Sequence, residues 1–316
     1  MNAYFSCKSI NLDDIILEPG WDLHPFLPPD VPFFQPRDSI RQHGLLYLPL
    51  LWPSNQGRYL CLTGGRCLAT AQALSPAAKV AARVIRGDLP GIAVAGLLHA
   101  EYTLQRQLSP LELAHFLRLC QQKLPETAQQ KVYSLVGIPD QPQFLARHTE
   151  LLKLEDWIQY GLWQERVSEN MAREMLRMEK EDRATFFGLV SRLNIGTGRQ
   201  KRLLMFLRDL AGRHGLSFQQ LLAEESLQSI LDHQEMNIPQ KGQALLQQLQ
   251  RLHSPAQSQK EEQFLRWQRQ LDLPRNCTIA HSQAFEQDRV SLTLQFVDPR
   301  LLEEFLGNIR KYLPRE

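Results

Sequence analysis

The sequence has 316 residues, more than one ordinary hydrophobic core accommodates, and this length predicts two or three compact units. Hydrophobic residues make up 43% of the chain and charged residues 22%, a composition that excludes a wholly disordered protein. The formal net charge is only +2, but seven Arg or Lys residues and a single acid, Asp209, fall between Arg183 and Arg213. That segment is predicted to contact polyanions.

Cysteine usage and hydropathy indicate a cytoplasmic protein. The five cysteines are an odd number without close pairing, and no apolar signal-type segment opens the sequence. The longest apolar runs, 44–52 and 89–98, are far shorter than the roughly 20 residues of a membrane-spanning helix, so we expect no membrane role. The cysteines and histidines show no zinc-ligand spacing, and neither a Walker-type phosphate loop nor a nucleophile elbow is present.

The first 98 residues are rich in proline and change period repeatedly, which predicts an α+β domain. The expected elements are a helix over 38–43 ended by Gly44, strands over 45–52 and 58–62, a helix over 66–74 and a strand over 79–85. Between the second strand and the second helix, Gly64 and Gly65 form a turn. Free N–H groups and the positive end of the helix dipole suit a phosphate at such a turn. The alternative is a tight corner without ligand.

Residues 99–223 are predicted to form an all-helical domain. Its first clear signal is Ser109, Pro110 and Glu112, which match an N-cap, a first-turn proline and a capping-box glutamate. Two helices, over 127–136 and 141–152, are joined by the short segment 137–140, as a helix-turn-helix requires, and Asp140 is expected to cap the second helix. Further helices are predicted over 154–160, 168–179, 183–193, 199–214 and 217–222.

The rest of the chain is predicted to contain a linker and a small terminal module. Residues 224–272 are rich in Gln and interrupted by proline, which indicates helical connectors without a new core. Residues 273–316 have the pattern strand, strand, helix, over 277–281, 289–296 and 299–312. Because such a fragment buries too little surface for stability alone, we expect it to form a homodimer or to pack on the rest of the protein.

Three motifs in chain order resemble those of ParB-type partition proteins. Residues 38–46 are similar to the SI-xx-xG-(I/L) opening of the family's N-terminal domain, and residues 59–71 resemble the strand that leads into its GERR-x-x-A-A turn. Glu101 with residues 108–114 resembles the EN-x-QR-x-x-L-(N/S)-P-x-E-x-A box. The helix pair then falls where the family has its helix-turn-helix, and 277–306 is faintly similar to the family's dimerisation module. The resemblance implies a ParB/sulfiredoxin-like N-terminal domain followed by helical and dimerisation domains.

The resemblance also implies ligands and partners. Family members bind CTP with Mg²⁺, which carries over to Gly64, Gly65, Arg66, Cys67 and Glu101, with Glu101 also as the metal ligand. They read a palindromic DNA site, form homodimers and work with a ParA-type ATPase on the bacterial nucleoid.

This sequence departs from the family pattern at the same positions. Gly65, Cys67 and Tyr102 stand where the family has Glu, Arg and Asn, so one cationic phosphate contact and one amide oxygen for magnesium are missing. Hydrolysis is therefore less well supported than binding. A helix N-terminus and Arg66 would lower the pKa of the Cys67 thiol, whereas the alternative is a packed structural cysteine.

Two groups of residues are candidate DNA contacts. At the start of the second helix of the pair, the side chains suited to read base edges are Gln141, Gln143 and Arg147. The alternative is a retained scaffold that reads no bases. Farther along, the cations placed to contact phosphates are Arg199, Lys201 and Arg202, and the alternative is a solvated helix face.

The leading interpretation is a divergent ParB-type DNA-binding protein, acting in DNA partition or a related nucleoid or plasmid process, with nucleotide regulation left open. A CTP-dependent switch or CTPase is one alternative. The other is a protein-interaction adaptor that has lost ligand binding.

Overall fold

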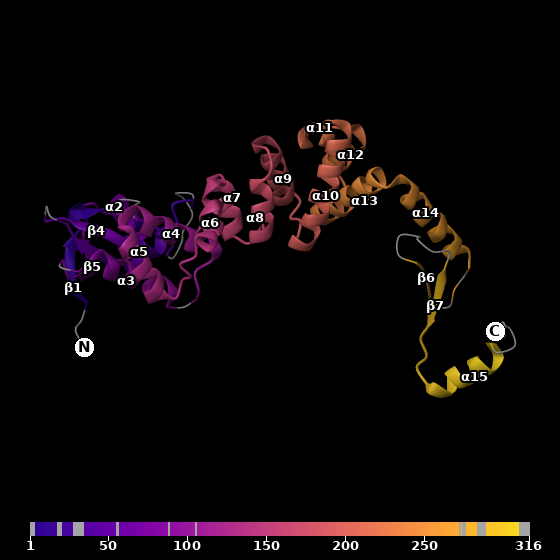
Figure 1. The fold of residues 1–316 in the computed structure, drawn as a ribbon, viewed down its shortest axis with the longest axis horizontal. Helices are drawn as coiled ribbons and strands as arrows, with labels where there is room; N and C mark the ends of the chain where they lie inside the picture. Colours follow the sequence, from indigo (N-terminus) through magenta and orange to yellow (C-terminus); the bar gives the residue numbers. More distant parts are fainter. Residues whose placement is uncertain are drawn as a thin grey trace. The chain divides into compact units, whose positions relative to one another are not determined.

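The computed structural model describes residues 4–17, 21–27, 35–54, 57–87, 89–104, 106–271, 273, 276–282 and 289–309. The chain is a mixture of helices and strands that divides into two compact units, residues 1–191 and 192–316 (Figure 1). In the part of the chain that is described, no helix combines the length and the apolar character needed to cross a membrane. Residues 98 and 99, where the sequence predicts a domain boundary, lie inside one helix, and the observed division after Ser191 falls within the predicted helical domain.

The first unit contains a five-stranded mixed sheet in the order β1-β5-β3-β4-β2. The strands are β1 Phe5–Asn11, β2 Ile15–Ile16, β3 Leu50–Pro53, β4 Tyr59–Thr63 and β5 Lys79–Ile85. β1 pairs antiparallel with β5, from Phe5 opposite Ile85 to Asn11 opposite Lys79. β3 is antiparallel to β4 and parallel to β5, and β2 is parallel to β4.

The predicted strand over 45–52 begins only at Leu50, because side chains bind the backbone groups before it. The backbone N–H of Leu46 donates to the Gln35 side chain, and the carbonyl of Leu48 accepts from the Arg83 guanidinium. These bonds replace ladder hydrogen bonds and hold the segment as a loop.

Each face of the sheet carries its own hydrophobic core. On one face, Leu51, Ala82 and Val84 pack with buried residues of α1 Arg37–His43 and α2 Gly65–Leu74. On the other face, Leu50, Leu62 and Ile85 pack with helices α3 Gly91–Thr103, α4 Pro110–Lys123 and α5 Glu126–Val136. The predicted α+β domain and the first predicted helices therefore share one core.

The helices predicted from Ser109 to residue 222 all occur, with shifts of a few residues at their ends. After α5 the first unit continues with α6 Pro142–Thr149, a 3₁₀ turn over Glu150–Lys153, α7 Asp156–Trp163, α8 Glu169–Leu176 and α9 Lys180–Arg192. The second unit contains α10 Thr197–His214 and α11 Phe218–Leu222. It goes on with α12 Glu225–Asp232, α13 Ile238–His253, α14 Pro255–Gln270, strands β6 Cys277–His281 and β7 Val290–Leu294, and α15 Pro299–Ile309.

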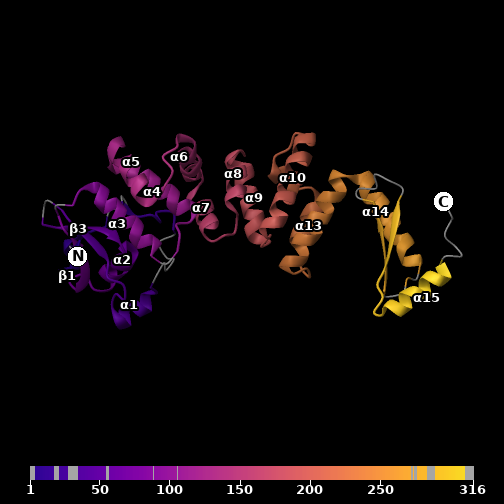
Figure 2. The ribbon, with the colours of Figure 1, turned by 60° about the horizontal axis from the view of Figure 1, so that its bottom comes forward.

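The predicted linker contributes to a core in its first half. α13 lies beside α10 in Figures 1 and 2, and Leu245, Leu246 and Leu249 are buried there. Apolar residues four apart fall on one helix face, which is why a Gln-rich sequence still packs. The strand, strand, helix pattern of the terminal module is confirmed, with Cys277 opposite Leu294 in an antiparallel pair. The expected end of its helix at Tyr312 lies outside the described residues.

Candidate functional site

The predicted glycine turn opens onto a pocket. β4 ends at Thr63, and Gly64 adopts a left-handed backbone conformation with φ +81° before α2 begins. A Cβ atom at Gly64 would lie 3.2 Å from the Cβ atom of Pro49, so glycine is required both by conformation and by space. Gly64, Gly65 and Arg66 line a pocket of about 220 Å³ together with Asp22 and Tyr102.

The charge of Arg66 is directed to the main chain. Its Nη2 atom donates to the carbonyl oxygens of His24, at 3.2 Å, and Leu27, at 2.6 Å. Arg66 thereby fixes the loop 21–27 against the start of α2. Asp22, the other charged residue in the described lining of the pocket, brings a carboxylate to the same wall.

Burial favours the protonated thiol at both cysteines beside the turn. Burial raises the pKa of the half-buried Cys67 thiol and outweighs the opposing hydrogen bond with the Gln35 backbone. Burial and the Asp22 carboxylate raise the pKa of the neighbouring Cys61 thiol to about 12. The raised pKa of the Cys67 thiol favours a packed structural cysteine over a reactive thiolate.

Glu101, the predicted metal ligand, forms an ion pair instead. Its two carboxylate oxygens accept from the Arg83 guanidinium at 2.9 and 2.5 Å, and Arg83 also donates to the Leu48 carbonyl. In the described lining of the pocket the residue from α3 is Tyr102 and not Glu101. Burial raises the pKa of the Tyr102 phenol, so this group stays neutral.

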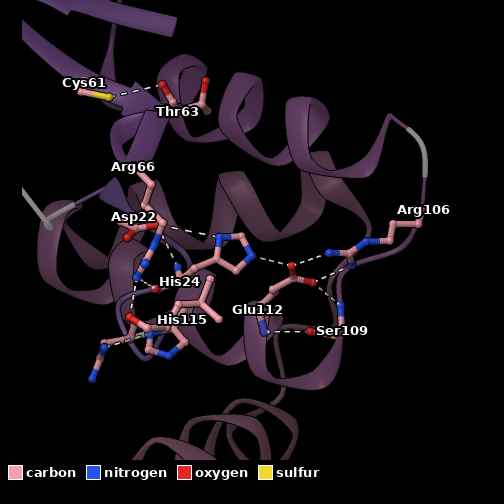
Figure 3. Close-up of polar contacts among 11 residues, drawn as sticks. Asp22, His24, Cys61, Thr63, Arg66, Arg106, Ser109, Glu112 and His115 are labelled. Carbon is pink, nitrogen blue, oxygen red and sulfur yellow. Dashed lines mark hydrogen bonds and ion pairs between the residues drawn. The ribbon is translucent and has the colours of Figure 1, made fainter. Parts of the chain in front are cut away.

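Behind the pocket lies a buried ionic network, of which the sequence motifs predict only a part. Glu112 is fully buried at the start of α4. Its carboxylate accepts from His24 Nε2 at 2.6 Å, from Arg106 at 2.6 and 2.7 Å and from the Ser109 backbone N–H at 2.8 Å. Figure 3 shows His24 between Asp22 and Glu112, with Arg106 and Ser109 on the far side of the carboxylate. The sequence predicted the Ser109–Glu112 capping box, which is confirmed, but not the contacts of Glu112 with His24 and Arg106.

The network keeps Glu112 charged inside the protein. Burial by itself would raise the pKa of the Glu112 carboxyl, but hydrogen bonds from Arg106, His24 and Ser109 outweigh it and hold that pKa well below its usual range. His24 and Phe26, whose ring stacks on His115 at 5.3 Å, thus attach the loop 21–27 to α4.

The residues present do not fit a nucleoside triphosphate with magnesium. Such a ligand needs several cations for its phosphates and carboxylate or amide oxygens for the metal. Among the described pocket residues, the positive charge comes from Arg66, which is bound to carbonyl oxygens and faces the Asp22 carboxylate. The Glu101 carboxylate, the predicted metal ligand, is paired with the Arg83 guanidinium.

The predicted helix pair is present as α5 and α6. α5 ends at Gly137, which is left-handed with φ +73°, and α6 begins at Pro142. The prediction that Asp140 caps α6 is wrong. Gln141 occupies the N-cap without a side-chain hydrogen bond, and Pro142 stands at the first helical position, where its fixed φ suits the helix.

The predicted base-reading side chains Gln141, Gln143 and Arg147 are all exposed. The Arg147 guanidinium lies 3.9 Å from the Glu169 carboxylate. α6 buries none of its residues fully, although its Leu145 packs against the core of the first unit.

The other predicted DNA contacts lie at the start of α10, in the second unit. Arg199 and Lys201 are exposed, and neither forms an ion pair with any described residue. Arg202 donates to the Gln250 side chain and lies over the Phe206 ring at 5.6 Å. Arg183, at the start of the basic segment, belongs to the first unit and pairs with Glu155.

No protein-family model matches this sequence, and no curated protein matches it either. Among solved structures, one similar chain is the C-terminally truncated chromosome-partitioning protein ParB from Caulobacter crescentus, complexed to the centromeric parS site. It is 19% identical, with 62% of this chain and 97% of that chain covered and a TM-score of 0.31. The truncated ParB from the same organism complexed with CTP-gamma-S is 20% identical, with 58% and 98% covered and a TM-score of 0.24. Both neighbours are ParB proteins.

Proposed function

We propose that this chain is a DNA-binding protein of a divergent ParB type, acting in DNA partition or a related nucleoid or plasmid process. The observation that carries the proposal is the start of α10, where Arg199 and Lys201 are exposed without an ion pair to any described residue. Unpaired surface cations release counterions from DNA when they meet phosphates, which drives binding. The helix N-terminus at Gly196 adds a positive dipole end to the same surface.

The arrangement of α5 and α6 supports the same proposal. A short turn through left-handed Gly137 joins the two helices, and the second presents Gln143 and Arg147 to solvent. Gln and Arg side chains form bidentate hydrogen bonds with adenine and guanine edges. In this proposal α6 reads bases and α10 contacts the phosphate backbone.

A fluorescence-anisotropy titration of duplex DNA at two salt concentrations tests the proposal. We expect the R199A/K201A double variant to bind about tenfold or more weakly at low salt, and its salt slope to be smaller by roughly two. The matched control is K260A/R269A, which removes the same charge from exposed positions of α14. Undetectable binding of the unsubstituted chain at low salt, or an equal loss in both double variants, would overturn the proposal.

The proposal does not extend to CTP turnover. Arg66 and Glu101 make their strongest contacts with protein groups, and the pocket beside them carries a carboxylate. We expect calorimetry to detect no saturable binding of CTP with or without Mg²⁺. Magnesium-dependent binding would favour the alternative of a CTP-regulated switch.

The homodimer and the ParA-type ATPase are the remaining partners that the resemblance implies. Exposed apolar side chains on β7 and α15, among them Leu292 and Leu301, support a homodimer. The ATPase stays an expectation, and a chain that binds neither DNA nor nucleotide would fit the adaptor alternative.

A further inference from the structure

The last turn of α6 is attached to α8 by an arginine side chain. Arg173 is 16% exposed, and its Nη1 atom donates to the backbone carbonyl of Arg147, 26 positions earlier in the chain. The last four carbonyls of a helix lack partners within the helix, and a cation near them is favourable. Arg173 therefore supplies both a hydrogen bond and a positive charge to this end of α6.

The same guanidinium is held on its other side by Glu169. Arg173 Nε and Nη2 both donate to Glu169 Oε1, at 3.1 and 2.6 Å. Glu169 lies in the first turn of α8, where a carboxylate is favourable, and Ser168 caps that end of the helix. The buried Met171 and Met175 pack α8 into the domain. The Glu169–Arg173 pair therefore stands on an anchored helix.

Glu169 also lies beside the side chain of Arg147. Its Oε1 atom is 3.9 Å from Arg147 Nη2, and the Arg147 side chain is 61% exposed. At this distance the contact is an ion pair and not a hydrogen bond, so it orients the guanidinium without using its N–H donors. Such an exposed pair is weak, and a base edge can replace it. The Glu169–Arg173 pair thus contacts Arg147 at both its carbonyl and its guanidinium.

A side chain that reads a base has to be held within about 0.5 Å of the productive geometry by contacts around it. α6 buries none of its residues fully, and Leu145 is its contribution to the larger described core of the first unit. The polar contacts from α8 act on Arg147 itself, the residue of α6 whose guanidinium matches a guanine edge.

In the proposed function, on which this inference rests, Arg147 reads a base. A long side chain that is ordered only on binding lowers affinity and discrimination, whereas one that is held in advance avoids this loss. We propose that Arg173 and Glu169 are positioning residues, which hold Arg147 for base reading and so set the sequence preference of α6. In this role neither residue contacts DNA.

Arg173→Lys separates position from charge. Lysine keeps the positive charge, but its single ammonium group cannot reproduce the planar fork that reaches Glu169 and the Arg147 carbonyl together. The matched control is Arg177→Lys on the same helix, where an exposed arginine pairs with Glu174. Neither substitution changes the net charge, so both variants should bind a scrambled duplex within about twofold of the unsubstituted chain.

The measured quantity is a preference. It is the affinity for a duplex that the unsubstituted chain selects from a randomised pool, divided by the affinity for the scrambled sequence. Because one bidentate arginine contact supplies roughly tenfold discrimination or more, Arg173→Lys should lower the preference by about fivefold or more. Arg177→Lys should change it by less than about twofold.

A double-mutant cycle with Arg147→Ala tests whether the effect passes through Arg147. In the Arg147→Ala background, Arg173→Lys should cause no further loss of preference, because the side chain that it positions is gone. An equal further loss in that background, an unchanged preference in Arg173→Lys, or the same loss in Arg177→Lys would overturn the inference.

Hydrogen exchange without DNA checks the fold of the variants. Arg173→Lys should speed amide exchange over 146–149 and leave α4 unchanged. If exchange rises throughout the first unit, Glu169→Gln replaces it, with the same expected loss of preference. A chain that binds neither duplex would refute the proposed function together with this inference. Binding without sequence preference would refute base reading by α6 and this inference, but would leave DNA contact by α10 intact.

Discussion

At the scale of single residues, the most informative feature is how buried ionisable groups are held in one charge state. Glu112 stays ionised because three donors surround it, whereas His115 stays neutral. Burial and the nearby Arg118 guanidinium lower the pKa of His115 to about 3. The two groups lie three residues apart on one helix, and burial favours the neutral form of both; only Glu112 has hydrogen-bond partners that outweigh burial.

Neutral His115 makes stability depend on pH. In the unfolded chain its pKa is near 6.5, so between pH 6.5 and about 3 the unfolded state binds the proton and the folded state does not. Stability from this group is present above pH 6.5 and falls as the pH falls through that window. The expected loss at pH 5 is about 2 kcal/mol.

Urea unfolding at pH 7 and pH 5 measures this loss. His115→Gln, which keeps a donor for Gln159, should show a smaller difference between the two pH values. His43→Gln, at an exposed position, should keep the full difference. If His115→Gln showed the same difference in stability between pH 7 and pH 5 as the unsubstituted chain, His115 would not be the source of this pH dependence.

At the scale of elements, local sequence signals predicted some features and missed others for identifiable reasons. Gly64 and Gly137 were assigned to turns, and both are left-handed, because only glycine adopts that conformation without strain. α3 was missed because Gly91–Thr103 is apolar on all sides and shows no helical period. The contacts Arg83–Glu101 and His24–Glu112 join residues 18 and 88 positions apart, and no local pattern marks them.

Two glycine substitutions should have opposite effects. Gly64→Ala should destabilise the chain by about 1–3 kcal/mol, since alanine is strained at φ +81° and its Cβ would press on Pro49. Gly212→Ala should stabilise it by roughly 0.5–1 kcal/mol, because Gly212 is inside α10 and a Cβ there meets open space. Denaturant unfolding of both variants compares them directly, and destabilisation by Gly212→Ala would contradict the helical position.

At the scale of the whole molecule, the terminal module leaves apolar surface uncovered. Val290 and Leu292 are each 53% exposed and lie on one face of β7, since side chains two apart share a face. On α15, Leu301, Leu302 and Leu306 are also exposed. A two-stranded sheet with an exposed apolar face is marginal alone, so pairing of two chains through this surface is the expected source of its stability.

Size-exclusion chromatography with light scattering tests this pairing. Leu292→Glu should convert a dimer to a monomer, because a buried carboxylate in the pair would lack a partner. Thr293→Glu, on the opposite face of β7, is the matched control and should leave the dimer intact. If Leu292→Glu or a chain truncated before residue 270 still dimerises, the surface has another role.

The position of Trp267 gives the second unit an optical reporter of its own. It is the single tryptophan after residue 191, it is 42% exposed on α14, and its neighbour Phe264 contacts His281 of β6 at 4.8 Å. The emission wavelength of a partly exposed indole shifts when the ring loses further contact with water. Assembly of the terminal module can therefore shift the intrinsic emission of the protein without any attached dye.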